Sequence, residues 1–580
     1  MTRRASIIGL AVAAMLLALG LQPWHLALGL VERHVVAGIE GRLGLKVTAI
    51  SRAEIALLPL PRISISEVAF TQPQGGLSGK AMRLRARARL LPLLAGRLDF
   101  DRIDLIGPEL DLRIDGPSES RTRWLAAPID YLRQLDRDTQ LVVTRGSLML
   151  RSEGTIQTTL RDLDLVVDGR SAGEPVSFNG SVTWRGEQTR LEVLWPVAGE
   201  RAEASLSLSA RPLTLQFKGN RTAALEVMTG KVSLTTASLP QALAWLGARP
   251  RIASLVRQVE LGADAQFAGY DLSLSGVSAK LDGDLLEGAL RINGANQRLM
   301  LSGTLAGADF DLGRLLRQAG QHPGGETAEG RETPLEFESW TAHDIDLRVS
   351  LDAARLGDAR LSELALQFMA KKGRFEVALL RAGSYGGTAR ARLLATPVAG
   401  GADVKLQFGL DKVNLSQAAA HLQGLAPFSG TLGAQFALEG VGDSFEQVVG
   451  SLTGRGTASL KQGEIRGVSF AEILRRPEKG AARDWRQGKT AFETAQFAAL
   501  VQGGVVYLTD GQVAGTGYGL SLSGHADLGR HWLEMTGILT ATGGASRSLF
   551  ELRGPFAAPA FTPGLDSIPP RDGLPSPLTR

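Results

Sequence analysis

The sequence contains no cysteine, which excludes disulfide bonds, cysteine-ligated zinc or iron centres and cysteine nucleophiles. Aromatic residues make up only 6% of the 580 residues. No long block of like charge occurs either, because 64 basic side chains are balanced by 59 acidic ones and the net charge is +5. Binding of nucleic acid relies on clustered basic residues. We therefore expect no nucleic-acid partner, and a fold that is stabilised by packing alone.

Signatures of enzymatic chemistry are also lacking. The seven histidines form no H-x-H or H-E-x-x-H pair, and there is no G-x-S-x-G elbow. Gly488-Lys489-Thr490 resembles the end of a P-loop, but Arg483 stands where the first glycine should be. We predict that the protein has no catalytic residue, no cofactor and no metal site, and that it is not an enzyme.

The N-terminus carries one long uncharged stretch. From Ala5 to Val31 there is no Asp, Glu, Lys or Arg, and about 20 apolar residues suffice to span a bilayer. Arg3 and Arg4 precede the stretch, which places the short N-terminus in the cytoplasm and the rest of the chain beyond the membrane. The sequence favours an uncleaved anchor helix, 1–31 with its cytoplasmic stub, over a cleaved signal peptide, which remains the alternative.

Beyond this stretch, apolar and polar residues alternate along most of the chain. In Arg62 to Phe70 the apolar Ile63, Ile65 and Val68 are separated by polar residues, and many similar runs follow. A period of two is that of a strand with one apolar and one polar face. Pairs with turn chemistry such as Asn179-Gly180 lie between the runs. The pattern predicts a mostly β fold, with about 25 to 30 consecutive, mainly antiparallel strands.

Helical periodicity is confined to a few places, which we expect to punctuate the sheet. The clearest cover residues 120–138 and 239–259, and shorter ones begin near Ser416 and Ser469. Residues 318–334 lack an apolar pattern and are predicted to be a linker between two β-rich regions, 32–317 and 335–562. The proline-rich tail 563–580 is expected to be disordered.

Several ordered motifs resemble those of the AsmA family of Gram-negative envelope proteins. The resemblance covers residues 1–60 and 335–562. Its N-terminal part includes Gly41-Arg42-Leu43-Gly44 and the run from Leu57 to Ile63, with echoes at 90–96 and 103–114. Its C-terminal part consists of motifs in the family's order at 344–347, 383–387, 430–442, 451–454, 460–468 and 524–529.

This resemblance implies a single-pass protein of the cell inner membrane with most of its chain in the periplasm. It also implies a long curled sheet that forms a taco-like apolar groove, and a part in outer-membrane lipid homeostasis through phospholipid transfer between the two membranes. Membrane phospholipid would then be the main partner, with outer-membrane or assembly proteins as further partners. The alternative is a non-enzymatic scaffold that modulates outer-membrane protein assembly.

Two sets of residues are candidates for contact with lipid. Alternation places Ile63, Ile65, Leu366 and Leu452 on the apolar side of the sheet, where they would line the groove. The second set alternates with Leu and Ala and would share one strand face; it consists of Arg83, Arg85, Arg87 and Arg89. Guanidinium groups bind phosphate in a bidentate manner, so these arginines could contact lipid headgroups. The simpler interpretation is a solvated outer face that discourages edge pairing.

Overall fold

The computed structural model describes residues 24–25, 35–40, 45–56, 58, 60–72, 76–95, 97–113, 139–152, 155–169, 175–195, 201–222, 227–247, 255–294, 298–320, 341, 343–399, 401–418, 428–474, 488–543, 546–555 and 560–563. This part of the chain is mostly β, which confirms the predicted class. It divides into two compact units. Unit 1 comprises Met1–Arg249, Arg257–Asp282 and Ala289–Leu299, and unit 2 comprises Pro250–Val256, Gly283–Gly288 and Met300–Arg580.

Unit 1 is built from strands that pair largely in chain order. They are β1 (Trp24–His25), β2 (Lys46–Ala49), β3 (Arg52–Ala56), β4 (Arg62–Thr71), β5 (Leu77–Ala88), β6 (Phe100–Arg113), β7 (Gln140–Ser152), β8 (Thr155–Asp168), β9 (Val176–Trp184), β10 (Glu187–Trp195), β11 (Arg201–Ser209), β12 (Thr214–Thr222), β13 (Val227–Thr236), β14 (Val259–Ala268) and β15 (Asp271–Leu281). From β4 to β15 each strand pairs with the next. β16 (Asp284–Asn293) is divided between the units.

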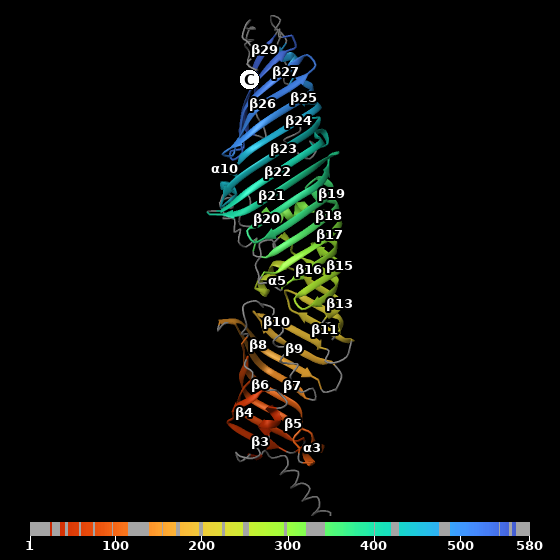
Figure 1. The fold of residues 1–580 in the computed structure, drawn as a ribbon, viewed down its shortest axis with the longest axis vertical. Coiled ribbons are helices and arrows are strands. Elements are labelled where there is room, and N and C mark those ends of the chain that lie inside the picture. The colour runs from red at the N-terminus through yellow and green to blue at the C-terminus, as the bar shows by residue number, and fades with distance from the viewer. Residues whose placement is uncertain are drawn as a thin grey trace, which may run out of the picture. The chain divides into compact units, whose positions relative to one another are not determined.

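Unit 2 repeats this arrangement, and Figure 1 shows its strands following one another in chain order. They are β17 (Met300–Asp311), β18 (Asp344–Leu356), β19 (Ala359–Lys371), β20 (Arg374–Ser384), β21 (Gly387–Val398), β22 (Gly401–Asn414), β23 (Thr431–Gly442), β24 (Thr453–Arg466), β25 (Lys489–Gln502), β26 (Val505–Gly515), β27 (Tyr518–Asp527), β28 (Trp532–Ala541), β29 (Arg547–Pro555) and β30 (Ala560–Pro563). Each pairs with the next one in the chain.

Two neighbouring pairs, one in each unit, are parallel rather than antiparallel. They are β6–β7 and β17–β18. A parallel pair needs a long crossover, whereas antiparallel neighbours need only a tight turn. The predicted helix 120–138 falls in the first crossover, outside the described residues. The predicted linker 318–334 falls in the second and therefore connects two paired strands of unit 2; its residues 318–320 belong to a helix and the rest lies outside the described residues.

Short helices accompany the sheets: α3 (Leu90–Leu94), α5 (Leu239–Leu246), α6 (Leu312–Gly320), α9 (Leu415–Ala418), α10 (Phe445–Gly450) and α11 (Phe470–Leu474). The helix predicted for 239–259 is α5, but it ends much earlier than expected. Gly247 has a φ of +90° and closes the helix as a left-handed cap, and Val259 already belongs to β14. The short helices expected near Ser416 and Ser469 are present as α9 and α11.

The expected anchor helix Ala5–Val31 lies mostly outside the described residues. Its two described residues form β1, in which Trp24 pairs with Ile55 and His25 with Glu54. These two residues therefore lie in a strand and not in the predicted helix. Among the helices of the described part, none combines the length and the apolar character needed to cross a bilayer. The tail beyond residue 563 is also outside this part.

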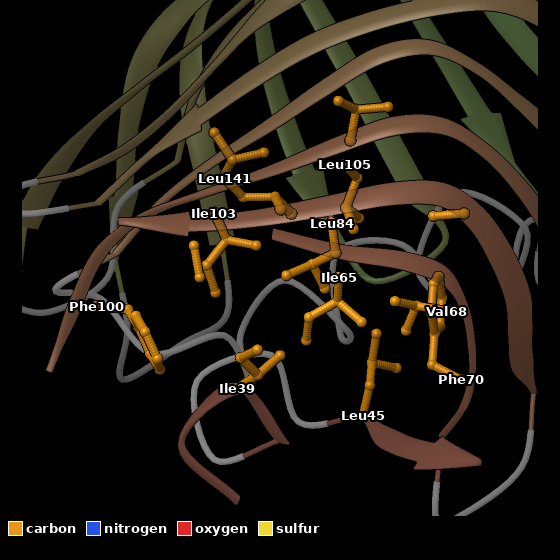
Figure 2. Packing of buried hydrophobic residues seen from close by; sticks show 14 of the residues in the cluster. Ile39, Leu45, Ile65, Val68, Phe70, Leu84, Phe100, Ile103, Leu105 and Leu141 are labelled. Atoms are coloured by element: carbon orange, nitrogen blue, oxygen red, sulfur yellow. The ribbon is translucent and has the colours of Figure 1, made fainter. Parts of the chain in front are cut away.

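The N-terminal strands of unit 1 enclose a compact apolar core (Figure 2). A helical segment at 35–40 covers the apolar face of β4 to β6, with Val35 and Ile39 only 2% and 1% exposed. Phe100, at the start of β6, is fully buried, and a Cβ at Gly38 would lie 3.0 Å from its ring. The apolar face of unit 1 is thus closed at its first strands.

Candidate functional site

The sheet of unit 2 has one continuous apolar face. Residues that face each other directly across neighbouring strands form a row with one member from each strand between β17 and β29. This row, here the middle row, consists of Leu305, Val349, Leu366, Leu379, Ala391, Phe408, Phe436, Gly456, Ala499, Leu508, Gly524, Met535 and Leu552. Every member is apolar or glycine, so no charge interrupts the face.

A second row, two residues further along the strands, is equally apolar. It consists of Gly303, Leu347, Phe368, Val377, Leu393, Leu406, Leu438, Gly454, Val501, Val506, Ala526, Leu533 and Gly554. The rows together make an apolar surface that is several side chains wide. Gly456 makes room for a ring on this surface, because a Cβ there would lie 2.1 Å from Cδ1 of Phe436.

The two edges of this face are buried, whereas its middle is open. One edge is buried over β18 to β22, as a cluster around Ala370 and Phe375, and the other over β24 to β29, as a cluster around Leu520 and Leu539. Between them the middle row is half-buried, and Phe408 is 36% exposed. A continuous apolar surface that is left open in this way is typical of a binding surface.

Short helices pack at both edges. At one edge α10 follows β23; its Val448 is buried, and Ser444 Oγ accepts a hydrogen bond from the Gln447 amide. At the other edge α11 packs Phe470 against Tyr518, with ring centroids 5.3 Å apart. The Tyr518 hydroxyl donates to the Ala491 carbonyl, and burial raises its pKa to about 12. The helices thus lie on either side of the half-buried middle row, which is called the open strip of the apolar face below.

The opposite face of the same strands is polar. A directly paired row there reads Arg348, Gln367, Ala378, Arg392, Gln407, Ala437, Arg455, Leu500, Tyr507, His525, Glu534 and Arg553. A depression of about 1040 Å³ has most of its lining on this face, where Arg390, Arg392, Arg455 and neighbouring glutamines stand beside Leu380 and Leu500; residues of the middle row, such as Leu379 and Phe408, also contribute to it. The sheet therefore separates an apolar side from a polar, charged side.

Glu376 is the most buried charge of this polar face. Its carboxylate accepts hydrogen bonds from Arg374 (2.7 Å) and Arg392 (2.8 Å). Burial raises the pKa of the Glu376 carboxyl, but the hydrogen bonds and charges of the two arginines outweigh burial and hold it below its ordinary value of 4.5. The ion pairs are complete above that value and are lost as the pH falls through the lowered pKa.

Replacement of Glu376 should therefore destabilise unit 2 in a pH-dependent way. We expect Glu376→Gln to lower the free energy of unfolding by about 1–2 kcal/mol at pH 7, since two charge-assisted hydrogen bonds to half-exposed arginines are lost. The difference from the unchanged protein should shrink as the pH falls through the lowered pKa of Glu376. Denaturant unfolding at pH 7 and at a series of lower pH values measures this. Glu439→Gln is the control, because Glu439 is exposed and lies 3.9 Å from Lys405; equal losses in both variants would contradict the prediction.

Unit 1 shows the same division into two faces. Its apolar row runs through Val143, Leu165, Gly180, Leu191, Leu208, Leu215, Leu234, Leu261 and Ala279. α5 packs at one edge of this unit, where the Trp245 and Trp184 ring centroids are 4.6 Å apart and Trp245 Nε1 donates to the Trp184 carbonyl. The two-faced design is therefore a property of both units.

The four residues predicted to line a groove have different surroundings. Leu366 lies in the middle row and is half-buried. Leu452 lies between α10 and β24, at the edge of the apolar face, and its Cδ2 would be 3.2 Å from a Cβ at Gly440. Ile63 and Ile65 are on the apolar side of β4, but they are only 3% and 1% exposed. They lie in the closed core rather than on an open surface, because the 35–40 segment covers them.

The four arginines lie on the polar face: Arg83, Arg85 and Arg87 in the second half of β5, and Arg89 just beyond it. Arg87 pairs with Asp101 at 2.6 Å, and Arg89 with Asp99 at 3.1 Å. Burial raises the pKa of the Asp101 carboxyl, but the hydrogen bond and charge of Arg87 outweigh it and lower the pKa overall. Arg83 and Arg85 are exposed. Arg87 and Arg89 thus form ion pairs on the polar face, and because β5 is paired on both sides, by β4 and β6, neither arginine guards a free edge.

The sequence did not reveal the middle row. Phe408, Phe436 and Leu508 belong to strands that the alternation predicts, but their alignment depends on register, which alternation alone does not fix. Register could have been traced only from the hairpin turns, counted strand by strand.

Comparison with protein families matches residues 213–510 to the AsmA family. This confirms the resemblance seen in the sequence, and the matched range extends it to the middle of the chain. Comparison with curated proteins gives no match.

Proposed function

Since this chain belongs to the AsmA family, we propose that it is a non-enzymatic groove protein that takes part in outer-membrane lipid homeostasis by transferring phospholipid. In this proposal the N-terminal apolar stretch anchors it in the inner membrane and its body lies in the periplasm. The open strip of the apolar face of unit 2 carries the acyl chains in a taco-like trough. The uninterrupted middle row is the observation on which the proposal rests.

The energetics favour such a use. Exposing an acyl chain to water costs about 0.8 kcal/mol of free energy for each methylene, or about 11 kcal/mol for a chain of about 14 methylenes. Contact with the apolar face would offset much of this cost. At about 4.8 Å per strand, the rows from β17 to β29 extend over about 58 Å along the sheet, which exceeds the ~30 Å of a bilayer core. The face is long enough to accept a whole lipid tail.

Site-specific photo-crosslinking tests this proposal. A benzoylphenylalanine at Leu366, Leu406 or Leu438 should capture phospholipid in cells, because these side chains lie on the apolar face. The matched controls are their chain neighbours Gln367, Gln407 and Glu439, which lie on the polar face, and Ile63, which is enclosed. We expect at least tenfold more lipid at the first set. Capture of outer-membrane protein without lipid would favour the scaffold alternative instead.

A further inference from the structure

A small pocket opens on the apolar face of unit 2, at the edge that carries α9 and α11. Its volume is about 240 Å³, and no polar atom is exposed in it. The lining residues are Leu415, Phe428, Leu432, Leu460, Ile465, Phe492, Ala495, Phe497 and Val513. The pocket is distinct from the large depression on the polar face.

The strands build the pocket around one small residue. Ala495 pairs directly with Leu460 and Val513, and Leu460 pairs with Leu432. Because alanine stands between larger neighbours, the floor of this row is hollowed at its centre. Ala495 is only 3% exposed, so the pocket lies within the packed cluster of this edge.

The start of α9 and the rings of Phe428 and Phe492 form the walls of the pocket. The Leu415 amide donates to the Gly430 carbonyl, which fixes the start of α9 beside the pocket. Phe428 forms an isolated bridge with Ile465. Opposite Phe492 stands Gly463, where a Cβ would lie 2.4 Å from the Phe492 ring. Glycine thus allows the ring to lie across the neighbouring strand and to close one side.

The chemistry of these walls selects an apolar guest. Water needs two to four polar partners in a cavity, and an engineered apolar cavity of about 150 Å³ stays dry and binds benzene. A larger pocket without a polar atom cannot hold a headgroup or a peptide backbone. An alkyl chain end has no polar atom to satisfy.

We infer that this pocket receives the methyl end of an acyl chain that lies on the apolar face, and so fixes where along the sheet a lipid tail stops. The inference rests on the proposed function. Phe497 supports the connection, since it lines the pocket and pairs with Ala458 and Gly511, in the row next to the middle row. A tail could therefore pass from the open strip into the pocket over apolar atoms alone.

Two photoreactive phospholipids test the inference on the full-length protein in vesicles. One carries a diazirine at the terminal carbon of its acyl chain, and the other carries it beside the ester. Labelled residues are mapped by mass spectrometry. We expect the terminal probe to label Phe428, Phe492 and their neighbours at least fivefold more than the ester-proximal probe, while both probes label the middle row.

Filling the pocket provides the matched comparison. Ala495→Phe, or Leu432→Trp as a second variant, should reduce terminal labelling of the pocket at least fivefold and leave labelling of the middle row intact. Ala498→Phe is the control, because Ala498 lies on the same strand but faces the polar side, where it pairs with Thr457 and Asp510. Thermal unfolding verifies that each variant is folded.

The outcomes are distinct. Equal labelling of the pocket by both probes, or pocket labelling that survives in both filled variants, would overturn the inference. Labelling confined to the middle row would overturn it too but would leave the proposed function standing. Absence of labelling anywhere on the apolar face would overturn both.

Discussion

Leu379→Asp is expected to reduce phospholipid capture by the apolar face of unit 2 at least tenfold, whereas Leu380→Asp should leave it unchanged. Leu379 lies in the middle row between Leu366 and Ala391 and is half-buried. A carboxylate there would have to lose water whenever an acyl chain passes, and an isolated charge in apolar surroundings costs several kcal/mol. A crosslinker at Leu406, one strand beyond Ala391, reports the capture.

Leu380 is an unusually close control for this change. It is the next residue of the same strand and the same amino acid, but successive side chains of a strand point to opposite faces, and Leu380 is 54% exposed. Both variants add one negative charge to β20, so a general effect of charge would affect them alike. If both lose capture, or neither does, the apolar face of unit 2 is not the path of the lipid.

Phe100→Ala should destabilise unit 1 by about 3–5 kcal/mol, the cost of truncating a fully buried phenylalanine. Phe100 packs beneath the 35–40 segment that closes the apolar face there, as the close approach of Gly38 shows. Hydrogen exchange should show faster opening of β5 to β7. Denaturant unfolding of the full chain gives the free energy.

Phe408→Ala is the matched control for that loss. Phe408 carries the same side chain but is 36% exposed on the open strip, so its removal should cost less than about 1 kcal/mol. A similar loss in the two variants would mean that the open strip is packed as tightly as the closed core, which contradicts its assignment as a binding surface.

The alternation of the sequence predicted the strands well, but its irregularities carried information that a simple period misses. In β4 the apolar residues step from Ile65 to Val68 rather than to position 67. Glu67 has a φ of +48° and is left out of the pairing, since Ser66 pairs with Arg83 and Val68 with Ala81. The register is the same on both sides of Glu67, which stands opposite Met82, so the left-handed conformation of Glu67 rather than an inserted residue keeps both apolar residues on the same face. A step of three in an alternating run is thus a sign of a left-handed residue within the strand.

Turn chemistry misled in one instance. Asn179-Gly180, expected between strands, lies inside β9, and the hairpin turn comes later at Arg185-Gly186, where φ is +47° and +85°. Gly180 instead allows β9 to lie close to β8, because a Cβ there would lie 2.1 Å from the Asp164 carbonyl oxygen. Glycine in a strand and glycine in a turn look alike until the partner strand is known.

For the candidate site, the sequence predicted only which side of the sheet each residue faces. Alternation correctly put Ile63 and Leu366 on apolar sides, but it does not tell whether another segment covers them. Coverage at Ile63 comes from the 35–40 segment, which is remote in sequence from β4. Such long-range packing leaves no local pattern in the sequence. Only the structure therefore shows which of these side chains are exposed.

The nearly unbroken chain order of the strands also has a consequence for how the protein folds. Most antiparallel strands need only a short hairpin to find their partners, so the sheet can grow largely one strand at a time from any nucleus. Longer connections join the antiparallel pairs β13–β14, β22–β23 and β24–β25, and the longest join the parallel pairs β6–β7 and β17–β18, where the chain from Arg113 to Gln140 and from Asp311 to Asp344 must close as a loop. Closing such loops instead of tight turns costs about 2 kcal/mol more in chain entropy. We therefore expect strand addition to be slowest at these two connections.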